Sequence, residues 1–142
     1  LDVGCGIGEF LETHPNSVGC DINKNSIKYC HDKNLMVFYC NIEKNTPKET
    51  YDGIFCSNVI EHLKNYTNGL NNINESLKEG GILIILLPNK RGYKRDKTHN
   101  PKFNYNELII WLKNKNYKIK KSNLLKLPIP LCFNDIVLIC KK

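Results

Sequence analysis

The chain begins Leu1-Asp2-Val3-Gly4-Cys5-Gly6-Ile7-Gly8, a mostly apolar triplet followed by three glycines at alternating positions. The triplet predicts a short buried strand, and the glycines predict a turn directly after it. A bound molecule can approach the backbone closely there, because glycine has no side chain. Asp2 is an acid just before the first glycine, and a second acid, Asp21, follows the next apolar run, Val18-Gly19-Cys20. An acid at the end of the second strand can accept hydrogen bonds from both hydroxyls of a ribose. These features predict a pocket for a ligand that contains a ribose.

Apolar runs alternate with amphipathic stretches along all 142 residues, which is typical of a parallel sheet covered by helices. The last two runs, 117–127 and 135–142, are too close together for a helical crossover, so we expect them to pair as an antiparallel hairpin. We therefore expect one α/β domain over residues 1–142, a three-layer sandwich whose mostly parallel sheet ends in an antiparallel C-terminal strand. The other predicted strands are 1–3, 17–20, 36–40, 51–57 and 81–87; the predicted helices are 9–13, 24–33, 105–114 and a long one over 58–78, broken near Asn68-Gly69 and ending at Glu79-Gly80-Gly81; residues 88–104 are predicted to be irregular.

The start of the sequence, its apolar runs and its cysteines indicate the cellular compartment that we expect. The sequence starts inside a predicted strand and without a methionine, so we expect an N-terminal helix region to be missing from it. No run approaches the roughly 18 apolar residues of a membrane span. The seven cysteines are odd in number and show no C-x-x-C spacing, which favours buried thiols over disulfides or a zinc site. We expect a cytoplasmic protein that does not enter a membrane.

Three kinds of ligand use glycine turns of this type. A Walker loop needs a lysine after the glycines, and none follows here. A dinucleotide turn, G-x-G-x-x-G, places pyrophosphate on the next helix, but the position of its third glycine is Glu9, whose charge would repel phosphate. S-adenosylmethionine carries a ribose and an adenine without phosphate, and its cationic sulfonium and amino groups suit Asp2 and Glu9. It is the cofactor that we expect.

Four stretches then resemble the successive motifs of class I S-adenosylmethionine-dependent methyltransferases, in the family's order and spacing. They are Asp2-Val3-Gly4-Cys5-Gly6-Ile7-Gly8, Gly19-Cys20-Asp21-Ile22, Tyr51-Asp52-Gly53-Ile54-Phe55-Cys56-Ser57 and Leu77-Lys78-Glu79-Gly80-Gly81. The resemblance covers essentially the whole chain and implies a Rossmann-like fold.

The resemblance also implies roles for the residues at the strand ends. The glycine turn would face the methionine part of the cofactor, and Asp21 would hold the ribose. The family usually has an aspartate after the third strand that receives the adenine amino group; here Asn41 stands in its place, with an amide oxygen that can accept the same hydrogen bond. An ordinary turn role for Asn41 and a helix-capping role for Asp21 are the alternatives. The predicted cofactor-binding residues are Asp2, Gly4, Cys5, Gly6, Gly8, Asp21, Ile22, Asn41, Ile42 and Ser57.

The reacting end should lie above the carboxyl ends of the strands. Asn58, Glu61 and His62 follow the fourth strand at positions i, i+3 and i+4, which predicts one shared helix face. His99 follows the fifth strand, in a segment that usually contacts substrate in this family. We predict Glu61, His62 and His99 as catalytic residues, with His62 as general base and Glu61 orienting it.

The same residues resemble the E-x-x-E-H motif of ubiquinone-pathway O-methyltransferases and small-RNA 3′-end methyltransferases, which holds a divalent cation. Asn58 replaces the first glutamate of that motif, which leaves a weaker site for a hard cation such as Mg²⁺. We therefore do not expect a metal, and name Glu61, His62 and His99 only as its tentative ligands. A third reading makes Glu61-His62 ordinary helix-start residues.

The net charge of +7 has two interpretations. A general excess of lysine and asparagine indicates an AT-rich genome rather than a nucleic-acid partner. The local exception is residues 90–102, which contain both arginines of the chain, Arg91 and Arg95, together with Lys90, Lys94, Lys97 and Lys102. The sequence thus predicts methyl transfer to an oxygen or nitrogen of a small molecule; the alternatives are an RNA end or another anionic acceptor, and a non-catalytic domain that only binds S-adenosylmethionine.

Overall fold

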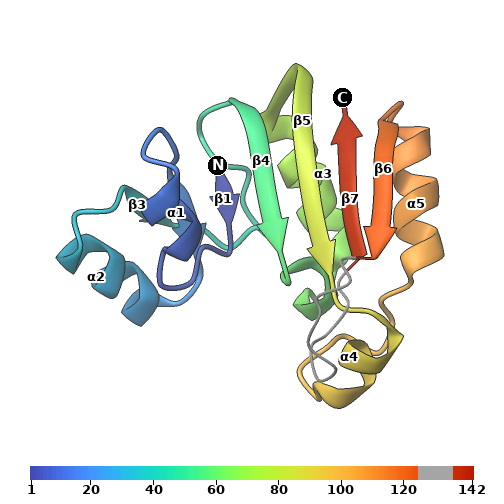
Figure 1. Cartoon of the computed structure of the whole chain (residues 1–142), viewed down its shortest axis with the longest axis horizontal. Helices are drawn as coiled ribbons and strands as arrows, with labels where there is room; N and C mark the ends of the chain where they lie inside the picture. The colour runs from blue at the N-terminus through green and yellow to red at the C-terminus, as the bar shows by residue number, and fades with distance from the viewer. Residues whose placement is uncertain (125–135) are drawn as a thin grey trace.

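The computed structural model describes residues 1–124 and 136–142 (Figure 1). Cys132 and the tip of the predicted C-terminal hairpin lie outside this range, as do the side chains of Lys90 and Arg91 in the basic segment. Within it, no helix is both long enough and apolar enough to cross a bilayer.

The described strands form one mixed sheet, in the order β3-β2-β1-β4-β5-β7-β6. Neighbouring strands from β3 to β5 are parallel, whereas β7 is antiparallel to both β5 and β6. This confirms the expected parallel sheet and its antiparallel C-terminal hairpin. The strands are β1 (Asp2–Val3), β2 (Gly19–Asp21), β3 (Val37–Tyr39), β4 (Tyr51–Ser57), β5 (Leu77–Leu87), β6 (Lys118–Leu124) and β7 (Ile136–Lys141).

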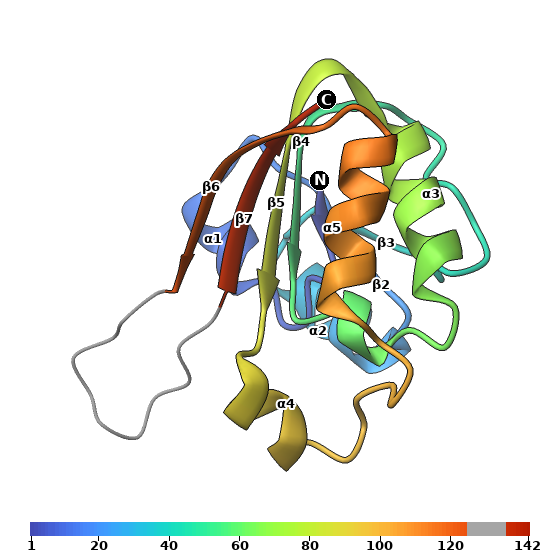
Figure 2. The same cartoon turned by 90° about the vertical axis from the view of Figure 1, so that its right-hand side faces the viewer.

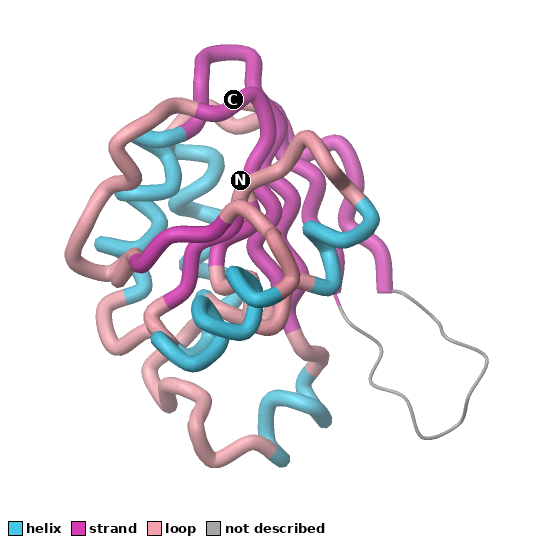
Figure 3. Tube along the Cα trace, turned by 90° about the vertical axis from the view of Figure 1, so that its left-hand side faces the viewer, coloured by secondary structure: helices cyan, strands magenta, loops and turns pink. Residues whose placement is uncertain are grey.

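Helices lie on both faces of the sheet. Figure 2 shows α3 and α5 on one face and α1 on the other, and helices again flank the strands in the opposite view of Figure 3. The predicted α/β sandwich is therefore present. The helices are α1 (Glu9–Thr13), α2 (Lys24–Asp32), a 3₁₀ helix η1 (Ile60–His62), α3 (Tyr66–Ser76), α4 (Lys90–Arg95) and α5 (Tyr105–Asn114).

The prediction of one long helix over 58–78 with a break near Asn68-Gly69 is wrong. The chain makes only the short η1, leaves the helix at Leu63, and starts α3 at Tyr66, where the Asn65 side chain accepts a hydrogen bond from the N–H of Asn68 at 3.1 Å. Gly69 lies inside α3, and a Cβ at this position would sit 2.5 Å from the Leu63 side chain. The glycine thus lets Leu63 pack closely and does not break the helix.

Two further boundaries differ from prediction. Strand β5 starts at Leu77 rather than at Gly81, and Gly80, with φ of 77°, lies in an irregularity of the strand instead of at a helix end. Glycine suits this place because it adopts positive φ without strain. Residues 90–95, predicted to be irregular, form α4, which lies beyond the carboxyl end of β5 (Figure 1).

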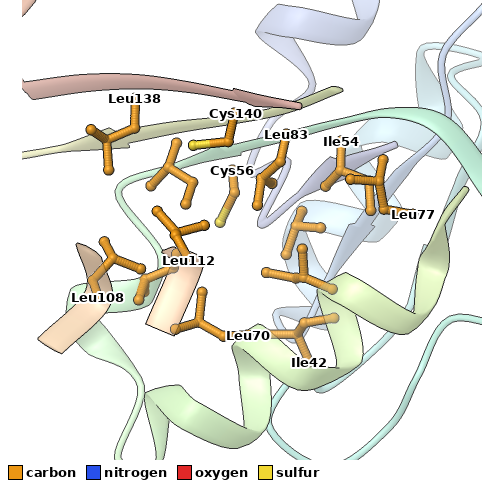
Figure 4. Packing of buried hydrophobic residues seen from close by; sticks show 14 of the residues in the cluster. Ile42, Ile54, Cys56, Leu70, Leu77, Leu83, Leu108, Leu112, Leu138 and Cys140 are labelled. Atoms are coloured by element: carbon orange, nitrogen blue, oxygen red, sulfur yellow. The ribbon is translucent and has the colours of Figure 1, made fainter. Parts of the chain in front are cut away.

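The main core lies between the sheet and the helices α3 and α5. In Figure 4, side chains of β4, β5 and β7 meet those of the two helices; Ile54, Leu83 and Leu138 face Leu70 and Leu112, and all five are at most 2% exposed. The six cysteines in the described part of the chain are buried and unbridged, which confirms the predicted buried thiols. Because β1 pairs in parallel with both β2 and β4, the carboxyl ends of these three strands lie side by side.

Candidate active site

A pocket of about 340 Å³ opens at the carboxyl ends of β1, β2 and β4; we call it the glycine-turn pocket. It brings together five of the predicted cofactor-binding residues and the predicted base His62. Ligand pockets in proteins start at about 300 Å³. The lining is Val3, Gly4, Cys20, Asp21, Ile22, Cys40, Asn41, Ile42, Glu43, Asn58, Val59, His62 and Leu63.

Gly4 forms part of the pocket wall where two segments approach each other closely. Its φ is 72°, and a Cβ at this position would lie 2.3 Å from Cγ2 of Val59. Both the backbone conformation and the space therefore require glycine. Gly6 has φ of 54° but open space around its Cβ position, whereas a Cβ on Gly8 would lie 2.4 Å from Leu35.

The Asp21 carboxylate is fixed by the turn that it faces. One oxygen accepts a hydrogen bond from the N–H of Gly6 at 2.9 Å, and the other accepts one from the N–H of Asn23 at 2.7 Å. Helix α2 is capped by Asn23, whose side chain accepts from Asn25 N, so Asp21 is not the helix cap. Each carboxylate oxygen keeps a further lone pair, so Asp21 can still accept hydroxyl hydrogens in a defined orientation.

Asn41 serves a turn and lines the pocket at the same time. Its Oδ1 atom accepts a hydrogen bond from the N–H of Glu43 at 3.1 Å, which is the ordinary turn role. It also stands beside Asp21 and the apolar side chains of Ile22 and Ile42 in the lining, and its amide oxygen can accept a second hydrogen bond. The two interpretations of Asn41 are thus compatible.

The remaining predicted cofactor residues, Asp2, Cys5, Gly6, Gly8 and Ser57, are outside the lining. Asp2 is buried in β1 at 4% exposure, and burial raises the pKa of its carboxyl to about 6. Burial likewise raises the pKa of the Cys5 thiol to about 12, so Cys5 is an inert core thiol. Both side chains are thus buried beside the glycine turn and do not face the pocket.

Asn58 does not share a helix face with Glu61 and His62, so that prediction is wrong. Asn58 has φ of 52°, in the left-handed region, and its N–H bonds to the carbonyl of Leu86 at 3.1 Å. Asparagine tolerates this conformation better than a glutamate does. The backbone at the end of β4 thus explains why an amide side chain stands at this position.

Glu61, His62 and His99 come together although they belong to distant segments. Their ligand atoms lie within 4.8 Å of one another, and the two imidazole rings are 4.7 Å apart. Glu61 is fully buried, whereas both histidines are partly buried, and His62 also lines the glycine-turn pocket. The structure therefore places the predicted catalytic residues at one edge of that pocket.

The partner that orients His62 was not predicted. The Thr98 Oγ1 atom lies 3.0 Å from His62 Nδ1 and also donates to the Asp96 carboxylate at 2.6 Å. Bonds from the Thr98 hydroxyl and N–H lower the pKa of Asp96, so this carboxylate is ionised and takes the single hydroxyl proton. Thr98 must then accept from His62 Nδ1–H, which leaves Nε2 as the basic nitrogen.

His99 is held by Tyr93 of helix α4. Its Nδ1 lies 2.8 Å from the Tyr93 carbonyl oxygen, and its ring stacks on the Tyr93 ring at 4.8 Å. Asn100 then ties the loop to η1: its N–H donates to the Glu61 carbonyl at 2.7 Å, and its side chain donates to the Leu63 carbonyl at 2.6 Å. The motif Asp96-x-Thr98-His99, an aspartate followed by a threonine two residues later, is the turn signal that could have indicated this loop.

Glu61, His62 and His99 offer donor atoms of the kind that bind metal ions. Two imidazoles and one carboxylate suit a borderline ion such as Zn²⁺ better than Mg²⁺. Ligands at about 2.1 Å from one ion are at most about 4.2 Å apart, so a spacing of up to 4.8 Å is wide for direct coordination. The donor types fit a cation, but the three groups would have to move together to hold it.

Comparisons with known proteins show which family the chain belongs to. A family model described as a methyltransferase domain matches residues 1–119. The chain is 33% identical over 102 residues to an uncharacterized protein of Methanocaldococcus jannaschii, covering 70% of this chain and 45% of that protein. It is 30% identical over 127 residues to malonyl-[acyl-carrier protein] O-methyltransferase 2 of Ilyobacter polytropus, covering 79% and 49%. The chain thus spans less than half the length of these curated relatives.

Other relatives are named for different activities, including (S)-coclaurine N-methyltransferase of Papaver somniferum, tRNA (carboxymethyluridine(34)-5-O)-methyltransferase of Arabidopsis thaliana and ubiquinone biosynthesis O-methyltransferase of Rickettsia bellii. Among solved structures, a SAM-dependent methyltransferase from Archaeoglobus fulgidus superposes with a TM-score of 0.76 at 24% identity, covering 99% of this chain and 84% of that one. This likeness shows the same fold. The chain therefore belongs to the methyltransferase-domain family, the class I S-adenosylmethionine-dependent methyltransferases.

Proposed function

We propose that the chain binds S-adenosylmethionine in the glycine-turn pocket and transfers its methyl group to an oxygen or nitrogen of a small-molecule acceptor. The observation that carries this proposal is that Gly4, Asp21 and Asn41 share one pocket with His62. Asp21 would accept the ribose hydroxyls, Asn41 the adenine amino group, and Ile22 and Ile42 would contact the adenine ring. The acids Asp21 and Glu43 in the lining favour a cationic cofactor over one that carries phosphate.

The chemistry at the methyl group follows from the orientation of His62. A lone pair of the acceptor oxygen or nitrogen attacks the methyl carbon, the carbon–sulfur bond breaks, and its electron pair stays on sulfur as S-adenosylhomocysteine. The acceptor loses a proton, which the Nε2 atom of His62 takes. Thr98 acts as a positioning residue, because it holds the Nδ1 proton and so keeps Nε2 basic. In this interpretation Thr98 replaces Glu61 as the group that orients the base.

Binding of the cofactor provides the direct test. Calorimetry should show one S-adenosylmethionine per chain, and Asp21→Ala should weaken binding at least about tenfold, since hydrogen bonds to a charged group contribute about 1.5–3 kcal/mol. Lys48→Ala, an exposed change outside the pocket lining, is the control. An affinity that Asp21→Ala leaves unchanged would contradict the proposed site.

The alternatives differ in their turnover. A degenerate domain that only binds the cofactor would show binding but no methyl transfer to any member of a panel of phenols, amines and RNA oligonucleotides. An RNA-end enzyme would transfer methyl only to the oligonucleotides. The exposed side chains of Lys94, Arg95 and Lys97 near the site are the observation that favours this second candidate.

A further inference from the structure

The loop of residues 41–46 follows β3 and contributes Asn41, Ile42 and Glu43 to the lining of the glycine-turn pocket. The loop lies beside α3 (Figure 2). The Asn72 side chain of α3 donates a hydrogen bond to the Ile42 carbonyl at 2.7 Å. The helix thereby holds the part of the pocket where the base of the cofactor would lie.

The side chain of Asn41 could recognise a purine in two ways. Its amide oxygen accepts a hydrogen bond, which suits the amino group of adenine, whereas its amide nitrogen donates one, which suits the carbonyl group of hypoxanthine. A carboxylate at the same place would only accept. The selectivity of the site therefore depends on which end of the Asn41 amide faces the ligand.

The backbone N–H of Glu43 favours one of these orientations. It donates a hydrogen bond to the Oδ1 atom of Asn41 at 3.1 Å. If the amide turned over, its own N–H donors would face the N–H of Glu43 and this bond would be lost. The oxygen therefore stays in place, and its second lone pair is available to an amino group.

The side chain of Glu43 holds that N–H group in position. Its Oε1 atom accepts a hydrogen bond from the backbone N–H of Asn65, the N-cap of α3, at 2.6 Å. A carboxylate at the start of a helix is stabilised by the helix dipole as well as by the hydrogen bond. Glu43 thus ties its own segment of backbone to the same helix that Asn72 ties to Ile42.

We propose that Glu43 is a positioning residue that makes the site selective for a 6-aminopurine, because its side chain fixes the N–H group that keeps the Asn41 oxygen directed at the ligand. The inference rests on the proposed function, since it requires that S-adenosylmethionine place its base at Asn41. Glu43 acts through Asn41 and does not itself read the base.

The probes are S-adenosylhomocysteine and S-inosylhomocysteine, in which a carbonyl replaces the amino group of the purine. Calorimetry should show that the wild-type chain binds the adenosyl compound about tenfold more tightly, because the Asn41 oxygen would oppose the carbonyl oxygen of the inosyl compound. In Glu43→Ala the Asn41 amide is free to turn over, so the preference should fall to about threefold or less. Glu43→Gln keeps an acceptor for the Asn65 N–H and should restore most of it.

Two further variants separate the orientation of the amide from a general effect on the pocket. Glu49→Ala removes an exposed acid outside the lining and should leave the preference unchanged. Asn41→Asp accepts through either oxygen, so its preference should not depend on Glu43. Adding Glu43→Ala to Asn41→Asp should therefore leave the ratio of the two affinities unchanged, although both affinities can fall. A ratio that falls equally with Asn41 and with Asp at this position would overturn the proposal.

Thermal unfolding checks that each variant is folded. If Glu43→Ala does not fold, Glu43→Asp replaces it, because aspartate keeps the charge but is one methylene too short for the contact with Asn65. Full preference for the adenosyl compound in a folded variant that lacks this contact would also overturn the role of Glu43.

The same titrations separate this inference from the proposed function. If the wild-type chain binds neither compound, the proposed function fails and the inference fails with it. If it binds both equally well, or prefers the inosyl compound, the cofactor site stands and the inference alone fails.

Discussion

The hydroxyl oxygen of Thr98 lies 3.0 Å from Nδ1 of His62, although 36 residues separate them in the chain. The contact joins the 3₁₀ helix η1 to the loop after α4. Asp96 completes the series by accepting the Thr98 hydroxyl proton. The histidine that lines the glycine-turn pocket is therefore oriented by a threonine and, through it, by a carboxylate.

Replacing Thr98 should change the tautomer of His62. In wild-type protein at neutral pH we expect the proton on Nδ1, because Thr98 accepts it. Thr98→Val has nearly the same shape but no acceptor, so the proton should shift largely to Nε2, and long-range ¹H–¹⁵N NMR spectra would report this. Thr98→Ser should behave as wild type, and an unchanged tautomer in Thr98→Val would contradict the orientation.

Adding a methyl group at Gly4 should disrupt the contact with Val59. Gly4→Ala combines a positive φ with a 2.3 Å clash, so we expect a loss of about 2–4 kcal/mol in the free energy of unfolding. Gly6→Ala meets open space and should lose only about 1 kcal/mol. Denaturant titrations would measure both, and Val59→Ala should recover part of the Gly4→Ala loss. Equal losses at the two glycines would refute the packing.

The buried Asp2 should make stability depend on pH in a definite direction. Burial raises the pKa of Asp2 from 3.8 to about 6, so the folded chain binds this proton more tightly than the unfolded chain. Between these pH values stability must therefore fall as pH rises, by up to about 2 kcal/mol. The difference in free energy of unfolding between wild type and Asp2→Asn isolates this effect. A difference that stays constant from pH 4 to pH 7 would contradict it.

The spacing of up to 4.8 Å between the ligand atoms of Glu61, His62 and His99 leads us to expect that cofactor binding does not need a metal. Treatment with EDTA should leave S-adenosylmethionine affinity unchanged, and elemental analysis of the purified protein should find much less than one transition metal per chain. His99→Ala serves as the comparison, since it removes one of the three grouped side chains. One tightly held ion per chain, lost in His99→Ala, would show instead that Glu61, His62 and His99 close around a cation.

Much of the fold could be predicted because its signals are local. The glycines after β1, the acid that ends β2 and the short separation of the final two runs each have a direct consequence for the backbone. The strand order, however, depends on register between distant segments, and the ends of α3 and β5 depend on tertiary packing. Leu63 against Gly69 is an example, since neither residue alone shows that a glycine inside a helix receives a side chain.

The residues of the candidate site also differ in whether local sequence signals or tertiary contacts determine their positions. Asp21 ends β2 and Asn41 lies just after β3, so their position at the carboxyl edge of the sheet was predictable. Asn58 was misplaced because helical spacing was assumed where the backbone is left-handed. The contact of Thr98 with His62 was missed because it forms where a loop folds back over η1. A sequence pattern does not predict such a contact unless the turn motif is recognised first.

Asn100 links the segment that carries His99 to the segment that carries His62 by hydrogen bonds. Its backbone and side chain occupy carbonyl groups of Glu61 and Leu63, so the loop that carries His99 moves together with the segment that carries His62. An acceptor would then meet a surface that is already assembled, and little ordering entropy would oppose its binding. Binding of an acceptor should accordingly not require the His99 loop and the His62 segment to move relative to each other.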